Sequence, residues 1–212
     1  MRRPIIAREG WPFIGVLAAL ALLALLVHRG AAAVLAALAL FVMWFFRDPE
    51  RPVPQGERLV VSPADGRVMF VRTVEEPRFM GGRAILVSVF LSIFDVHINR
   101  APVAGEVAFR EYVPGKFLAA WDHAVGEVNE RSYLGLVTEA GQRVLVSQVA
   151  GLLARRIVTW PSVGDRLERG ERIGLIRFGS CTQLWLPPGS EILVKPGDRV
   201  LGGQTVIGRL PQ

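Results

Sequence analysis

The sequence predicts a mainly β domain that follows a pair of apolar N-terminal helices. Two uncharged apolar runs fill most of the first 46 residues, and long apolar runs without a polar face are typical of helices in lipid or in a protein interior. From about Leu59 to Leu210, short β-branched runs alternate with glycine and proline turn signals. Strands spaced this closely indicate an all-β sandwich or barrel. Two phrases that recur within this part indicate that the β domain has two similar halves.

The two apolar runs are predicted to form a helical hairpin. The first run, Trp11 to Val27, has 17 residues and the second, Ala31 to Phe46, has 16; His28-Arg29-Gly30 separates them. Both lie at the short end of the roughly 17–25 residues that span a bilayer. The hairpin therefore either crosses the membrane as two thin spans or dips in from one face, with His28 at its turn.

Basic residues at both outer ends orient this hairpin. By the positive-inside tendency they place both ends on the cytoplasmic side. A cleaved signal peptide is an alternative for the first run, but a second apolar run directly after it argues against cleavage. A buried hairpin of a soluble protein is another, but neither run has a polar face. The flanking arginines are Arg2, Arg3, Arg8, Arg47 and Arg51.

The amino-acid composition indicates which classes of molecule the protein binds. The net charge is +6, and Lys116 and Lys195 are the only lysines beside many arginines. A basic balance fits nucleic acid or an anionic lipid surface. The apolar N-terminus and the lack of a basic run with interleaved aromatics favour lipid over nucleic acid. The single Cys181 rules out an intrachain disulfide framework. The three histidines have no recognised zinc spacing, so we expect no metal; they are His28, His97 and His123.

Three segments follow from these patterns. We expect a membrane-anchoring hairpin at 1–47, a stiff linker rich in proline and charge at 48–58, and a β domain at 59–212. Within the last, Lys116 to Asn129 is less strand-like and is expected to be a loop or a helical turn. The predicted strand runs are Leu59–Val61, Arg67–Val71, Ala84–Leu91, Glu106–Phe109, Gln142–Val149 and Arg155–Trp160.

Two internal echoes sharpen the fold prediction. Pro63 to Val68 resembles Pro102 to Val107, and Val163 to Leu167 resembles Pro196 to Val200, each of the latter pair with trailing glycines. These phrases resemble the hairpins of lipoyl/biotinyl-like barrel-sandwich domains. That resemblance, which strand spacing alone would not supply, implies a duplicated barrel-sandwich (lipoyl-like hairpin) domain.

A candidate nucleophile stands near the C-terminus. Gly179-Ser180 lies between the apolar runs Ile173–Ile176 and Leu184–Leu186, which predicts a tight turn between two buried strands. Glycine leaves its own carbonyl open to attack, and the Ser180 hydroxyl is the nearest nucleophile. A Gly-Ser pair is also common in ordinary turns that have no catalytic role.

Candidate acid and base groups precede it. Asp95, His97 and Asn99 alternate after a long apolar strand, so on a strand they would share one face. An imidazole beside an acid suits general acid/base chemistry, and a structural histidine is the alternative. Asp65 stands before a glycine, a pattern typical of a turn that caps its own backbone. Arg100 either holds an anion or pairs with an acid.

Five phrases, together and in order, resemble the short prokaryotic form of phosphatidylserine decarboxylase, including its archaetidylserine decarboxylase-like subfamily. They cover essentially the whole chain beyond the hairpin. The phrases are Phe45-Phe46-Arg47-Asp48-Pro49-Glu50-Arg51, Ser62-Pro63-Ala64-Asp65-Gly66, Asp95-Val96-His97-Ile98-Asn99-Arg100-Ala101-Pro102, Asn129-Glu130-Arg131 and Phe178-Gly179-Ser180.

The resemblance implies self-processing between Gly179 and Ser180. The serine oxygen would attack the Gly179 carbonyl, and β-elimination of the resulting ester would leave a pyruvoyl group at residue 180. Residues 1–179 would become the β chain and 180–212 the α chain. Asp65, His97 and Ser180 match the positions that the family associates with this step.

The resemblance also implies the reaction and the partners. The pyruvoyl group, with no pyridoxal cofactor and no metal, would form a Schiff base with phosphatidylserine and release CO2 and phosphatidylethanolamine. His97 is expected to transfer protons, and Arg100 and Asn99 to contact the substrate. We expect an anionic phospholipid substrate, a heterodimer of the α and β chains that can pair into a homodimer, and a bacterial inner membrane location with the catalytic domain on the cytoplasmic side.

The sequence departs from the longer members of this family at two places, and one alternative function is also considered. Longer members carry a second histidine where this chain has Arg100, and they carry Leu-Gly-Ser-Thr where it has Phe178 to Cys181. Cys181 is either a second nucleophile or a small buried residue. The rival is a noncatalytic, membrane-anchored barrel-sandwich adaptor or carrier. Such adaptors usually have a long helical hairpin between their lipoyl halves, which is lacking here, and Lys195 before a proline fits a carrier lysine poorly.

Overall fold

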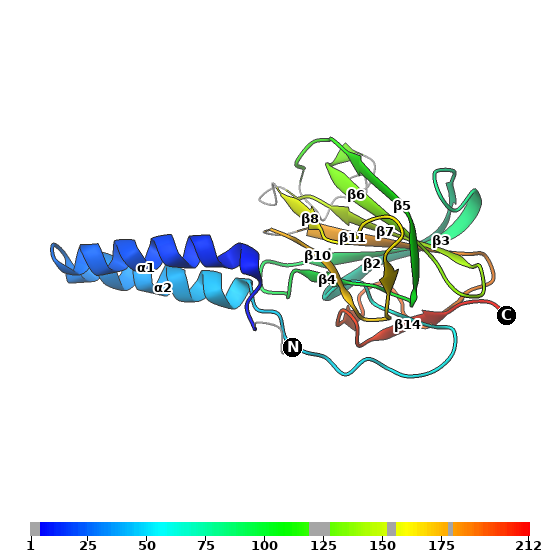
Figure 1. The fold of residues 1–212 in the computed structure, drawn as a ribbon, viewed down its shortest axis with the longest axis horizontal. Coiled ribbons are helices and arrows are strands. Elements are labelled where there is room, and N and C mark those ends of the chain that lie inside the picture. Colours follow the sequence, from blue (N-terminus) through cyan, green and yellow to red (C-terminus); the bar gives the residue numbers. More distant parts are fainter. Residues whose placement is uncertain (1–4, 119–127, 152–155, 178–179) are drawn as a thin grey trace. The chain divides into compact units, whose positions relative to one another are not determined.

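Two compact units make up the chain, Met1–Glu50 and Arg51–Gln212, drawn in Figure 1. The computed structural model describes residues 5–118, 128–151, 156–177 and 180–212.

The first unit is the predicted helical hairpin. A short 3-10 helix, η1 (Arg8–Gly10), leads into α1 (Trp11–Leu25), and α2 (Arg29–Phe45) runs back beside it (Figure 1). His28 lies at the turn as the N-cap of α2, where its Nδ1 accepts a hydrogen bond from the Ala31 N–H at 3.1 Å. A side-chain acceptor at this place satisfies an N–H that has no partner within the helix.

The hairpin is apolar on its outside. The segment Arg8–Leu25 is long and apolar enough to cross a membrane, judged by length and composition, and α2 is a shorter apolar helix. Only 11% of the first segment is buried, so its apolar side chains face outward, as in a helix that lies in lipid. The large exposed side chains of the two helices are Trp11, Phe13, Val16, Leu20, Leu22, Leu23, Leu25, Val34, Leu38, Leu40 and Trp44.

The second unit is built from antiparallel strands, which confirms the mainly β class. Its described strands form one eight-stranded sheet, β13-β2-β3-β11-β7-β6-β5-β9, and two three-stranded sheets, β1-β14-β12 and β4-β10-β8. Their bounds are β1 (Leu59–Val61), β2 (Gly66–Glu76), β3 (Gly82–Leu91), β4 (Ile98–Arg100), β5 (Gly105–Val113), β6 (Arg131–Val137), β7 (Arg143–Val149), β8 (Ile157–Thr159), β9 (Arg166–Leu167), β10 (Arg172–Ile176), β11 (Ser180–Leu186), β12 (Glu191–Ile192), β13 (Arg199–Val200) and β14 (Val206–Arg209).

The two sequence echoes occupy equivalent places in this unit. The Gly197 N–H donates to the Val68 carbonyl at 2.8 Å, and the Gly164 N–H donates to the Val107 carbonyl at 2.8 Å. β13 pairs with β2 as β9 pairs with β5, and a bulge follows Val68 as one follows Val107. One half therefore consists of β1–β3 with β11–β14, and the other of β4–β10. The predicted duplication is confirmed.

The core lies on one face of the large sheet. Strand residues alternate between faces, so β11 turns Ser180, Thr182, Leu184 and Leu186 to the same side, and the two leucines lie in the main core. The remaining members of that core include Val87, Val89, Leu91, Leu134, Leu136, Val144 and Val146. An aromatic cluster with Trp185 and Tyr133 covers the opposite face.

The predicted linker is partly bound to the β unit. The guanidinium of Arg169 donates to the carbonyls of Pro54 at 2.7 Å and of Gly56 at 2.9 Å. Of the stretch expected to be a loop, residues 119–127 lie outside the described part. On its flanks, the Lys116 N–H donates to the Val128 carbonyl at 3.0 Å.

Candidate active site

Two connections between the halves meet at one end of the sheet. The chain leaves the first half after β3 and returns to it at β11. Leu91, the last residue of β3, pairs with Ser180, the first residue of β11. Where β10 ends, the Ile176 N–H donates to the His97 carbonyl at 3.3 Å. The segment between Leu91 and His97 therefore begins beside Ser180, the first residue of β11, and ends beside Ile176, the last residue of β10.

Ser180 is fully buried at this junction. Its Oγ has no hydrogen-bond partner among the described residues. Burying a hydroxyl without a partner costs about 1–3 kcal/mol, so such groups are rare and often have a functional reason. Gly179, the other residue of the predicted cleavage site, lies outside the described residues.

His97 is buried and its backbone neighbour fixes its tautomer. Its Nδ1 lies 3.0 Å from the Asp95 carbonyl oxygen. Because a carbonyl can only accept, Nδ1 carries a proton, and in the neutral form of the ring the lone pair is then on Nε2. An imidazole in this form can accept a proton at Nε2.

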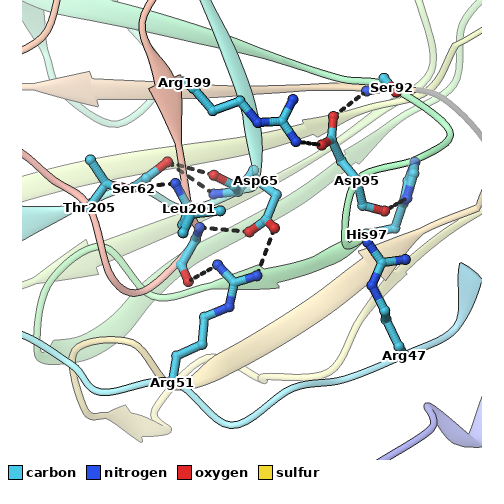
Figure 2. A network of polar contacts seen from close by, with 12 residues as sticks. Arg47, Arg51, Ser62, Asp65, Ser92, Asp95, His97, Arg199, Leu201 and Thr205 are labelled. Atoms are coloured by element: carbon cyan, nitrogen blue, oxygen red, sulfur yellow. Dashed lines mark hydrogen bonds and ion pairs between the residues drawn. The ribbon is translucent and has the colours of Figure 1, made fainter. Parts of the chain in front are cut away.

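Asp95 differs from the sequence expectation. We expected its carboxylate to share a strand face with His97 and Asn99, but β4 begins only at Ile98. Asp95 instead closes a turn: its Oδ2 accepts from the Ser92 N–H at 2.8 Å, and its Oδ1 pairs with Arg199 (Figure 2). The backbone carbonyl of Asp95, rather than its carboxylate, holds the imidazole.

Asp65 is held by groups far away in the sequence. Its Oδ2 pairs with Arg51 at 2.7 Å, and its Oδ1 accepts from the Gly202 N–H at 2.8 Å (Figure 2). Arg51 also donates to the Gly202 carbonyl at 3.3 Å. Asp65 therefore does not cap its own turn, and Arg51, which the sequence suggested as a hairpin flank, neutralises it.

The two predicted substrate contacts are both buried. Arg100 donates to the Gly170 carbonyl at 3.0 Å. Asn99 is fully buried and bonds to Thr182 and Gln148. These contacts fit structural roles better than contact with a ligand from outside.

Cys181 points away from Ser180, because neighbouring strand residues face opposite sides. It is fully buried and packs with Val149 and Met69. Burial raises the pKa of its thiol to about 12, against a smaller opposing effect of the Ser88 hydroxyl. A thiol that stays neutral is a poor nucleophile, so the structure favours the small buried residue over the second nucleophile.

Several residues at this junction were missed from sequence. Arg51 and Arg199 are two of many arginines, and nothing nearby in sequence marks their carboxylate partners. The polar residues of the sheet interior interrupt otherwise apolar strands, a signal that sequence could have offered. The described residues contain no group of three His, Cys, Asp or Glu that could hold a metal ion. His123 lies outside the described part.

Comparisons with known proteins point to one family. The family model described as phosphatidylserine decarboxylase matches residues 38–208. A protein of Symbiobacterium thermophilum, named phosphatidylserine decarboxylase proenzyme, is 81% identical over 212 residues, which covers 100% of this chain and 99% of the relative. Proteins with the same name from Carboxydothermus hydrogenoformans and Aromatoleum aromaticum are 45% and 47% identical, with at least 97% of each chain covered.

Proposed function

Since this chain belongs to the phosphatidylserine decarboxylase family, we propose that it is a proenzyme that breaks its own backbone before Ser180 and then converts phosphatidylserine to phosphatidylethanolamine and CO2. The observation that carries this is the buried Ser180 hydroxyl, which has no partner among the described residues and stands beside the segment that ends at His97. Family membership favours this enzyme over the adaptor or carrier.

Self-processing needs one base and one nucleophile. Ser180 Oγ gives its proton to the base and attacks the Gly179 carbonyl carbon; the peptide C–N bond then breaks and its nitrogen takes a proton. In the elimination that follows, a base takes the Cα proton of residue 180, a Cα–Cβ double bond forms, and the Cβ–O bond of the ester breaks, which releases Gly179 as a carboxylate. Water converts the dehydroalanine left at residue 180 to a pyruvoyl group, and ammonia departs. We assign the base to His97, whose Nδ1 is held by the Asp95 carbonyl, so that in the neutral form of the ring Nε2 carries the lone pair.

Asp65 is assigned a supporting role in the same step. Its carboxylate ties the turn before β2 to Gly202 in the future α chain, with Arg51 as counter-ion. This link joins both sides of the proposed cut, so it holds the junction in place before and after processing.

The pyruvoyl group at residue 180 would supply a ketone that takes the substrate amino group and the electrons left by CO2. The chain around it shields the site from bulk solvent, because Ser180, His97 and Thr182 are all buried. His97 is the proton carrier of choice, since an imidazole titrates near neutral pH. Arg100 stays a hypothesis for phosphate binding that would need its bond to Gly170 to open.

The strand order supports a stable pair of chains after cleavage. Residues 180–212 contribute β11 between β3 and β7, β13 beside β2 and β14 beside β1. We propose that the α and β chains stay together as a heterodimer; a homodimer of that unit is testable by its mass in solution. We also propose 1–47 as an anchor in the bacterial inner membrane, 48–58 as a linker and 59–212 as the catalytic domain on the cytoplasmic side.

Intact-mass analysis tests this proposal, with and without a hydrazine that traps ketones. Wild type should give two chains, 1–179 and 180–212, and only the second should gain the hydrazine mass. Ser180→Ala should stay one chain, whereas Ser147→Ala, which removes another buried hydroxyl without a described partner, should be cut like wild type. A folded wild-type preparation of one unbroken chain would overturn the proposal. CO2 release from vesicles of phosphatidylserine or of its ether-linked analogue identifies the lipid.

A further inference from the structure

A continuous chain of polar side chains runs through the interior on the face of the sheet that carries Ser180. Four of the five residues are buried, and Thr159 is half-buried. The bonds are Ser132 Oγ to Thr159 Oγ1 at 2.8 Å, Thr159 Oγ1 to Gln148 Oε1 at 2.7 Å, Gln148 Nε2 to Asn99 Oδ1 at 2.9 Å and Asn99 Nδ2 to Thr182 Oγ1 at 2.9 Å.

Three of these residues form one row across the sheet. Ser132 pairs with Gln148, and Gln148 pairs with Thr182, across β6, β7 and β11. Two residues further along the same strands and on the same face, the row is apolar: Leu134, Val146 and Leu184 belong to the main core. Along the core face of β6, β7 and β11, polar groups thus replace apolar ones at the end of the sheet where Ser180 stands.

The repeat supports a special purpose for this row. Pro63 and Pro102 occupy equivalent positions in the two halves. Val60 stands three residues before Pro63 and Asn99 three residues before Pro102, so Val60 is the counterpart of Asn99. Val60 is fully buried in the main core. An apolar residue therefore suffices to build this position in the other half, and the amide at Asn99 is an addition that folding of the half does not require.

Two backbone carbonyls fix the direction of the chain. The Pro63 carbonyl accepts from Asn99 Nδ2 at 3.4 Å, and the Val158 carbonyl accepts from Gln148 Nε2 at 3.5 Å. Both amides are thereby oriented, because carbonyls cannot donate. Since Thr159 gives its only hydroxyl proton to Gln148, Ser132 must donate to Thr159. Every bond therefore donates toward Thr182, and bonds aligned in this way strengthen one another.

We propose that Asn99, Gln148 and Thr182 are positioning residues for Ser180. The series of hydrogen bonds fixes the start of β11. The Thr182 oxygen accepts the last of these bonds, and the hydroxyl proton of Thr182 is the last donor of the series. It lies at the end of the strand where Ser180 stands. This rests on the proposed function of Ser180. It also changes the role of Asn99: both sides of its amide are used inside the protein, so it orients the nucleophile instead of touching substrate.

Self-cleavage kinetics test the proposal. The full chain is made by cell-free synthesis, and the appearance of the 180–212 fragment is followed over time. Thr182→Val keeps the side-chain shape and removes the hydroxyl, so we expect cleavage to slow about tenfold or more, since one hydrogen bond of ~1.4 kcal/mol corresponds to tenfold in rate. Thr182→Ser restores the hydroxyl and should cleave within about threefold of wild type. Ser147→Ala, on the other face of β7, should match wild type.

Melting temperatures separate positioning from mere stability. Each variant is also made with Ser180→Ala, so that all melt as one uncut chain. The inference is supported if Thr182→Val cleaves slowly and Thr182→Ser cleaves near the wild-type rate, while the melting temperatures of the variants do not follow the same order as their cleavage rates. Should Thr182→Val fail to fold, Asn99→Val, which copies the counterpart residue, takes its place with the same expected slowing. Cleavage of Thr182→Val at the wild-type rate, or rates that simply follow the melting temperatures, would overturn the inference. Wild type that never cuts would instead refute the proposed function.

Discussion

Replacing Arg51 with methionine is expected to destabilise the β unit strongly. The side chains of Arg51 and Asp65 are only 9% and 6% exposed, and their charged atoms are 2.7 Å apart. Arg51→Met keeps much of the apolar stem but leaves the carboxylate of Asp65 buried with the Gly202 N–H as its remaining described partner. Removing one member of a buried ion pair typically costs about 3–5 kcal/mol, because the other charge stays uncompensated.

The size of the effect distinguishes a lost pair from a lost contact. For a unit of this length, about 3–5 kcal/mol corresponds to a fall in melting temperature of roughly 6–20 °C. Removing both charges in Arg51→Met/Asp65→Leu should restore part of the loss, because no unpaired charge remains. We expect the double variant to be about 2–3 kcal/mol more stable than the sum of the single changes implies.

The assay is urea unfolding in the Ser180→Ala background, so that every variant is the same uncut species. Arg209→Met is the matched control, since Arg209 and Glu191 form an ion pair whose side chains are 52% and 55% exposed; its expected cost is below about 1 kcal/mol. If Arg51→Met is as mild as this control, or if the two single changes add up, the Arg51–Asp65 pair does not hold the junction as argued.

Three further predictions concern single residues. The Cys181 thiol, with its pKa raised to about 12, should resist alkylation at pH 8 until urea unfolds the protein. Because its neutral form is favoured on folding, stability relative to Cys181→Ala should be full below pH 9 and fall by on the order of 1 kcal/mol per pH unit from pH 9 to 12, measured by unfolding at several pH values. Gly66→Ala should unfold the domain or abolish its expression, since a Cβ would stand 1.9 Å from the Phe90 carbonyl oxygen; Gly141→Ala, with open space around it, should cost only about 1–2 kcal/mol in urea unfolding. His97→Asn keeps a donor for the Asp95 carbonyl but lacks Nε2, so self-cleavage should slow by about 10²-fold or more with little change in melting temperature, and cleavage at the wild-type rate would exclude His97 as the base.

The fold was predictable because its signals are local. Apolar runs of helical length predict the hairpin, and the repeated Gly-Asp phrases predict the hairpin turns of both halves. In each phrase the aspartate accepts from the N–H three residues before it: Asp165 from Ser162 and Asp198 from Lys195. Such turns depend on neighbours in sequence, so a short stretch carries the whole signal.

The site was predictable only as a set of residue types. Ser180 and His97 were named as candidates from their motifs, but the placement of Ser180 depends on its pairing with Leu91, across 89 positions of chain. The carboxylate of Asp95 also misled us, because its partner Arg199 stands 104 residues away. Long-range pairs of this kind follow from strand order, which no local pattern states.

The strand order itself explains why a backbone cut can be tolerated at this place. The break would fall between β10, which pairs with β4 and β8, and β11, which pairs with β3 and β7. Each strand is therefore held by neighbours other than the one it precedes or follows, so the cut separates no two strands that pair with each other. A cut inside a strand would instead place the new chain ends among residues that pair with neighbouring strands, and would disturb that pairing. A connection between two halves, each closed by its own strands, is thus a place where a protein of this fold can give up a peptide bond and keep its structure.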